Sequence, residues 1–304
     1  MFTPRRVEGL RPRIAEISDE LLDAMAGQEK VDLLDAFAFP LPMQVICELL
    51  GIPAGDRDDF RAWSSVIVAS EARPGEFPGA VMSMVAYLRE ILALRRATPG
   101  DDLLSALIEV RDSEDRLSED ELTSMVFLLL IAGYETMVNL LGNGTYLLLD
   151  QRERWEQLRA EPALLPTAIE EFLRFESSVD TATYRFPAEP VEIGGQEIPA
   201  YAPVMVSLLS ANRDEARFPN AGSVQLDRSP NLHLAFAHGI HHCLGAPLAR
   251  IEAQVAFAGL ISRYPSLELA VPAADLAWTP GVRMRGLVAL PVTLGQAAQQ
   301  STSA

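Results

Sequence analysis

The chain has 304 residues, of which 49% are hydrophobic and 22% are charged, as is ordinary for a soluble globular protein. Its formal net charge of −17 repels phosphate backbones and anionic lipid headgroups, so neither nucleic acid nor a membrane is an expected partner. Two cysteines cannot form a disulfide framework, the basic N-terminus lacks the apolar segment of a secretion signal, and the longest apolar run (125–132) is far too short to span a bilayer, so we expect a cytoplasmic protein.

Helical periodicity dominates the first two thirds of the chain. The pattern predicts helices over 13–25, from Pro40 and Pro42 to Gly51 and Pro53, within 99–118, from about Glu119 to about Leu149, and near 152–159 and 164–175. The helix over 119–149 begins with a capping box, Ser118 and Glu121, and is apolar nearly all round. We therefore expect it to pass through the middle of the fold.

The last third of the chain has a different character. Alternating residues, prolines and the Gly194–Gly195 turn indicate short strands and hairpins. A helix is predicted over 246–264 and terminal strands within 282–294, followed by a polar tail over 296–304 that we expect to be disordered. No linker divides the chain, so we expect a single domain over 1–304.

The long helix contains the segment AGYET, 132–136, where a glycine, an acid and an alcohol interrupt an apolar pattern. Glycine costs about 1 kcal/mol relative to alanine inside a helix, and a buried carboxylate needs partners. Threonine can hydrogen-bond the backbone and open the helix locally. Taken alone, the segment is equally well explained as a chance polar break.

All four histidines and one cysteine gather in 233–250. The spacing is Phe236-x-x-Gly239-x-x-x-Cys243-x-Gly245, with a helix predicted to begin at Ala246. Glycines let backbone N–H groups approach a sulfur atom, an aromatic ring excludes water, and a helix N-terminus stabilises a thiolate. These are the requirements of a loop that presents a thiolate to haem iron.

A zinc site and a plain turn are the alternatives for this segment. His238, His241, His242 and Cys243 have the ligand types of a zinc site, although adjacent residues converge poorly on one ion and the usual spacings are absent. A plain turn with a packed thiol requires no ligand, but it does not account for an aromatic residue, two glycines and a cysteine in this order.

The segment resembles the haem-binding signature of the bacterial cytochrome P450 monooxygenases. The resemblance implies a mainly α fold with small β-sheets, with haem b as the cofactor and Cys243 as the axial ligand of its iron. It further implies that Phe236 shields the sulfur, that Gly239 and Gly245 are turn glycines, and that His241 contacts a haem propionate. Ala237 departs from the family, which usually has glycine at this position.

Other segments match the same family in the same order. The resemblance implies that Ala132 and Gly133 make room over the haem and that Glu135 and Thr136 are catalytic, the alcohol positioning oxygen and a water and the carboxylate relaying protons. It assigns a structural triad to Glu171, Arg174 and Arg228, and a propionate contact to Arg185. Candidate substrate contacts lie in 126–132, 178–183 and 283–284, among them Val179, Thr181 and Met284.

The activity implied is insertion of one oxygen atom of O2 into a small apolar substrate, such as a polyketide or another secondary metabolite. Electrons are expected from a ferredoxin and its reductase. The chain begins within the family pattern, so the expected fold is N-terminally truncated and we expect it to bind haem weakly or not at all. The alternative is a haem-free, P450-like scaffold or binding protein without catalysis.

Overall fold

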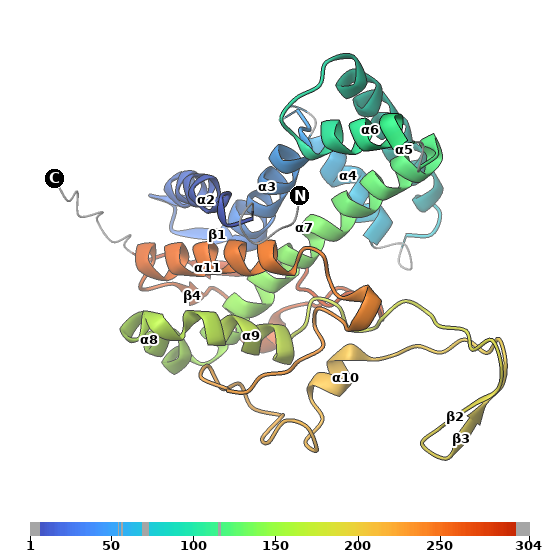
Figure 1. Cartoon of the computed structure of the whole chain (residues 1–304). Coiled ribbons are helices and arrows are strands. Elements are labelled where there is room, and N and C mark those ends of the chain that lie inside the picture. The colour runs from blue at the N-terminus through green and yellow to red at the C-terminus, as the bar shows by residue number, and fades with distance from the viewer. Residues whose placement is uncertain (1–6, 54, 56, 69–72, 115–116, 296–304) are drawn as a thin grey trace.

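The computed structural model describes residues 7–53, 55, 57–68, 73–114 and 117–295, so the tail predicted to be disordered lies outside the described residues (Figure 1). The fold is mainly helical with small sheets, as predicted. The helices are α2 (Arg11–Met25), α3 (Pro40–Leu50), α4 (Arg57–Val68), α5 (Phe77–Ala97), α6 (Leu103–Glu114), α7 (Glu119–Asp150), α8 (Arg152–Ala160), α9 (Leu165–Phe175), α10 (Leu208–Asn212) and α11 (Ala246–Arg263). The strands are β1 (Lys30–Asp32), β2 (Val191–Ile193), β3 (Gln196–Ile198), β4 (Glu268–Leu269) and β5 (Pro291–Thr293).

Helix α7 is the central element of the fold and crosses the molecule, with α3, α5, α6, α8, α9 and α11 packed against it (Figure 1). It begins at the predicted capping box: the Glu121 N–H donates to the Ser118 hydroxyl at 3.2 Å, and the Ser118 N–H donates to the Glu121 carboxylate at 2.8 Å. Its C-terminal half is almost entirely buried. By length and composition α5 and α7 could each cross a membrane, but half of the apolar α7 window is buried inside the fold, as in the core helix of a soluble protein.

The two sheets are small and antiparallel. Strand β5 lies between β1 and β4, with Val292 opposite both Val31 and Leu269. Strands β2 and β3 form the hairpin predicted at the glycine pair, and this hairpin projects away from the helices (Figure 1). Within 282–294, where terminal strands were predicted, only β5 is a regular strand. Met284 and Leu287 pair with the single residues Val179 and Trp278 in isolated bridges.

Three helices, α4, α5 and α10, were not identified individually from the sequence. The helix beginning at Pro40 is preceded by a π-helical turn, Leu34–Ala38, which periodicity did not reveal. The other boundaries agree with the predicted ones to within a few residues, since caps and prolines determine them.

Helix α11 lies beside α2 in the fold (Figure 1). At its C-terminal end, the Tyr264 hydroxyl donates to the Leu22 carbonyl oxygen at 2.6 Å, and Arg263 pairs with Asp23. A side chain on Gly259 would lie 3.0 Å from Leu22, so the two helices approach closely there. This packing fixes the helix whose first residue follows the cysteine loop.

Candidate functional site

The loop that bears Cys243 folds back on itself just before α11. The Cys243 N–H donates to the Phe236 carbonyl oxygen at 2.9 Å, and the His242 N–H donates to the Gly239 carbonyl oxygen at 3.1 Å. Ala237 and Gly239 both adopt the left-handed region, with φ of +58° and +65°. This conformation is routine for glycine and costly for alanine, because a Cβ atom crowds the backbone.

The sulfur of Cys243 lies at the N-terminus of α11, where it accepts hydrogen bonds from the N–H groups of Gly245 and Ala246. Gly245 has φ −82° and lies outside the left-handed region, so the turn itself does not require glycine there. The contribution of Gly245 is the approach of its N–H group to the sulfur. Burial raises the pKa of the Cys243 thiol, whereas the two N–H groups and the charge of Arg250 lower it, and the net shift is upward. The N–H groups at the helix N-terminus therefore lower the pKa of the thiol as expected, but burial outweighs them.

A charged network that sequence analysis missed lies against Phe236. The Arg250 guanidinium stacks over the Phe236 ring, 4.6 Å from its centre, and pairs with both carboxylate oxygens of Glu170 at 2.7 and 2.9 Å. His233 Nε2 lies 3.0 Å from the same carboxylate, and His233 Nδ1 accepts the Ala235 N–H, so Nε2 is the nitrogen that bears the hydrogen. Burial raises the Glu170 pKa, but the bonds from Arg250 and His233 outweigh it and lower the pKa to about 2.

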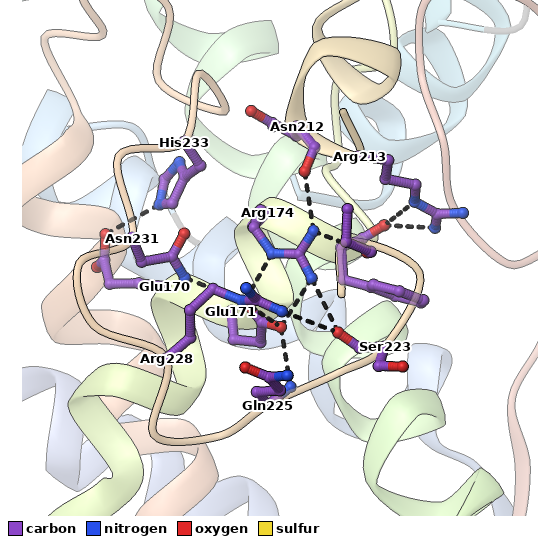
Figure 2. Close-up of polar contacts among 12 residues, drawn as sticks. Glu170, Glu171, Arg174, Asn212, Arg213, Ser223, Gln225, Arg228, Asn231 and His233 are labelled. Carbon is purple, nitrogen blue, oxygen red and sulfur yellow. Dashed lines mark hydrogen bonds and ion pairs between the residues drawn. The ribbon is translucent and has the colours of Figure 1, made fainter. Parts of the chain in front are cut away.

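The structure brings the predicted triad together in the core. Figure 2 shows Glu171 between two guanidinium groups: Arg174 donates to it at 2.7 and 2.8 Å, and Arg228 at 3.0 and 3.1 Å. All three side chains are buried, so charge pairing is required there. Further bonds run to the backbone and side chains of the segment before the cysteine loop, at Asn212, Ala221, Ser223, Gln225 and Asn231. The triad thus braces the chain that leads to Phe236.

The AGYET segment lies in the middle of α7. Thr136 Oγ1 donates to the Ala132 carbonyl oxygen at 2.9 Å, the backbone bond expected of a threonine there. Glu135 is half-buried; burial raises its pKa to about 7, while a hydrogen bond from Tyr134 opposes the shift. A Cβ on Gly133 would lie 2.9 Å from Ile46, so the structure gives this glycine a packing role against α3 besides the one implied by the resemblance.

Two predicted propionate contacts lie at the surface. The Arg185 guanidinium donates to the Thr183 carbonyl and hydroxyl oxygens at 2.9 and 2.6 Å, and among the described residues its only other bond is to the Tyr184 carbonyl oxygen. His241 is exposed in a short 3-10 turn, Gly239–His241. A cation that is held in place and lacks a protein anion is suited to bind an anionic group of a ligand.

The candidate substrate residues meet in a small strand-like layer. Val179 faces Met284 across an antiparallel bridge, and Thr181 Oγ1 donates to the Val282 carbonyl oxygen at 2.6 Å. Ser178 connects this layer to α7, because its hydroxyl donates to the Thr136 carbonyl oxygen at 2.7 Å. The sequence placed Ser178 in a candidate substrate segment but did not reveal its bond to Thr136.

Two further features lie apart from these residues. A cavity of about 460 Å³ between α2, α3 and the start of α11 is lined by residues such as Leu10, Ile14, Val45 and Leu248, and by none of the predicted site residues. No group of three or more histidine, cysteine, aspartate or glutamate side chains suited to a metal ion is found in the part of the chain that the structure describes. A zinc site in the histidine-rich loop is therefore unsupported.

Comparisons with known proteins agree with this geometry. The family model of cytochrome P450 matches residues 77–270. Cytochrome P450 107B1 of Saccharopolyspora erythraea is 51% identical over 294 residues, which cover 97% of this chain and 72% of that protein. Cytochrome P450 monooxygenase PikC of Streptomyces venezuelae is 47% identical, over 96% of this chain and 70% of its own. The tirandamycin C-bound structure of the P450 monooxygenase TamI superimposes with a TM-score of 0.92 at 49% identity, covering 96% of this chain and 72% of that one.

The fold and the cysteine loop thus define a haem-thiolate protein. The chain belongs to the cytochrome P450 family, and it is an oxidoreductase of the monooxygenase kind. Members of this family use haem b, a small-molecule substrate, O2 and redox partners. Relatives matched over nearly the whole chain include proteins named as a monooxygenase and as a hydroxylase, which leaves the haem-free scaffold without support.

The residues of this chain fit haem b. Cys243 offers a sulfur donor that already accepts two backbone N–H bonds, which stabilise negative charge on it. Apolar side chains stand exposed beside it, with Leu244 61% and Ile240 97% accessible, and an apolar macrocycle would cover such surface. Among the described residues Arg185 bonds only Thr183 and Tyr184, and it could pair with a propionate.

Proposed function

We propose that this chain inserts one atom of O2 into a mostly apolar secondary metabolite, with a polyketide as the best-supported class. The second oxygen atom becomes water by taking up two electrons and two protons. Support comes from 6-deoxyerythronolide B hydroxylase of Saccharopolyspora erythraea, which is 46% identical, and from the polyketide biosynthesis cytochrome P450 PksS of Bacillus subtilis, which is 42% identical. The candidate substrate layer has matching chemistry, since Val179 and Met284 are apolar and Thr181 has a hydroxyl group.

The proposal depends most on Cys243. When bound through its sulfur, haem b supplies the binding and reductive activation of O2. The N–H groups of Gly245 and Ala246 hold the sulfur and stabilise its negative charge, and the resemblance assigns the Phe236 ring to shielding it from water. Arg185 and His241 would bind the propionates.

Glu135 and Thr136 are proposed as the proton-handling pair. A carboxyl group whose pKa lies at about 7 can both hold and release a proton near neutral pH. The Thr136 hydroxyl donates its own hydrogen to the Ala132 carbonyl oxygen, so its oxygen remains an acceptor for a hydrogen bond from the reacting group.

A ferredoxin with its reductase is the proposed electron source, and the cytoplasm the proposed location. The resemblance to bacterial monooxygenases supports the first, since these members take electrons from separate carriers. The acidic composition, with a net charge of −17, and the burial of half of the apolar window of α7 support a soluble state.

The carbon monoxide difference spectrum of the reduced, haem-loaded protein tests the proposal. We expect the strongly red-shifted Soret band of a thiolate-ligated ferrous adduct, and we expect Cys243→Ala to abolish it. Cys47→Ala is the matched control, because it removes the other thiol, which is buried in α3. A band that survives in Cys243→Ala would refute the assignment of the ligand.

A further inference from the structure

Ser178 makes a direct bond from the candidate substrate layer to the oxygen-activating segment of α7. Its hydroxyl donates to the Thr136 carbonyl oxygen at 2.7 Å, and the residue is only 5% exposed. A helix carbonyl normally accepts the N–H four residues later, and its second lone pair is free for another donor. Ser178 uses that second site at the residue that also bears the candidate catalytic hydroxyl.

The backbone around Ser178 is fixed on its other side. The Arg285 N–H donates to the Ser178 carbonyl oxygen at 3.0 Å, and the Asp180 N–H donates to the Arg283 carbonyl oxygen at 2.9 Å. The Leu208 N–H donates to the Asp180 carbonyl oxygen at 2.8 Å, which attaches the same segment to α10. Ser178 therefore joins a hydrogen-bonded layer of three chain segments to the middle of α7.

We propose that Ser178 is a positioning residue that sets the place of Thr136 relative to the substrate layer. The inference rests on the proposed function of Thr136 in handling protons. The Ser178 hydroxyl and the Thr136 hydroxyl belong to the same junction, since one bonds the Thr136 carbonyl and the other bonds the Ala132 carbonyl one turn earlier. Misplacement of a reacting group by about 1 Å can cost about 100-fold in rate, so a bond that fixes this residue affects chemistry without touching the reacting atoms.

The chain supplies its own control next to this residue. Ser177 is 1% exposed, and its hydroxyl has no hydrogen-bond partner among the described residues. Ser177→Ala and Ser178→Ala thus remove the same atom from the same kind of environment, but only the second removes a bond to α7. Ser178→Thr keeps the hydroxyl and should restore the bond.

The first measurement is amide hydrogen exchange of the α7 peptide that contains Thr136, in the full chain with and without haem. A hydrogen bond of typical strength corresponds to about fivefold in an opening equilibrium. We expect Ser178→Ala to speed exchange in this peptide by about that factor, Ser178→Thr to return it toward the original rate, and Ser177→Ala to leave it unchanged. Equal effects of the two alanine variants would overturn the inference.

The second measurement is the fate of O2 in haem-loaded protein that receives electrons from a ferredoxin and its reductase without added substrate. Two electrons and two protons give hydrogen peroxide, and four of each give two waters. We expect Ser178→Ala to raise the peroxide fraction severalfold and Ser177→Ala to leave it unchanged. If Ser178→Ala unfolds, Ser178→Cys replaces it, since a thiol is only a weak donor.

Thr136→Ala separates this inference from the proposed function. If Thr136→Ala leaves the peroxide fraction unchanged, the proposed role of Thr136 is wrong. If Thr136→Ala raises the fraction and Ser178→Ala does not, the proposed function stands and the role of Ser178 is refuted.

Discussion

Ala237 provides the sharpest test of the local physics of the cysteine loop. Its φ of +58° places it in the left-handed region, where a residue with a Cβ atom pays about 1–2 kcal/mol. Glycine has no such penalty but loses about 0.4–1 kcal/mol through the greater freedom of the unfolded chain. Ala237→Gly should therefore increase the free energy of unfolding by about 0.5–1 kcal/mol.

Equilibrium urea unfolding, followed by the midpoint at an unchanged slope, measures this difference. Ala216→Gly is the matched control, because Ala216 is exposed in a turn and is not among the residues with positive φ. The control should lose about 0.4–1 kcal/mol, so the two identical substitutions are expected to have opposite signs. A loss of stability in Ala237→Gly equal to that of the control would refute the argument from backbone strain.

Three further substitutions test the charged groups. Glu252 is buried, and burial raises its pKa to about 8, so the folded state holds the proton more tightly than the unfolded state. The free energy of unfolding should therefore fall by up to about 1.4 kcal/mol per pH unit between about pH 5 and pH 8. Glu252→Gln should remove this slope in urea titrations at several pH values. As pH rises through about 7, Glu135 loses its proton, so the share of O2 reduced to water should fall and the peroxide fraction should rise. Glu135→Gln should abolish this pH dependence of the peroxide fraction. A wild-type peroxide fraction that stays constant across this range would contradict the assignment. Arg228→Ala leaves Glu171 short of one buried cation and should cost about 3–5 kcal/mol of unfolding free energy, whereas the exposed Arg159→Ala should cost less than about 1 kcal/mol; equal costs would contradict the argument.

The predictions that succeeded depend on local chemistry. A capping box opens α7 where Ser118 and Glu121 predicted it, and prolines with Gly51 bound α3, because each signal is contained within a few residues. The order of residues in the cysteine loop is equally local, and the structure folds it as a closed turn before α11. Sequence reasoning is strong at this range.

The features that sequence reasoning missed depend on distant partners. Glu170 meets Arg250 across 80 positions, and Ser178 meets Thr136 across 42, so no periodicity or spacing could reveal either bond. The direction of the Cys243 pKa shift needed the balance between burial and hydrogen bonds, which only the packed loop determines. Electrostatic balance and long-range pairing are properties of the folded chain.

The close packing of α11 on α2 has a mechanical consequence for the sulfur. Helix α11 has 18 residues, a length of about 27 Å, and is stiff along its axis, with Cys243 three residues before one end and the Tyr264 hydroxyl anchored to Leu22 at the other. Because α2 packs against α11, a tilt of α2 would displace the cysteine loop at the other end of α11, so the bond from Tyr264 to Leu22 helps to place the sulfur that we propose as the haem ligand. Leu22 and Tyr264 therefore affect the geometry of the proposed site although they lie at the far end of α11 from it.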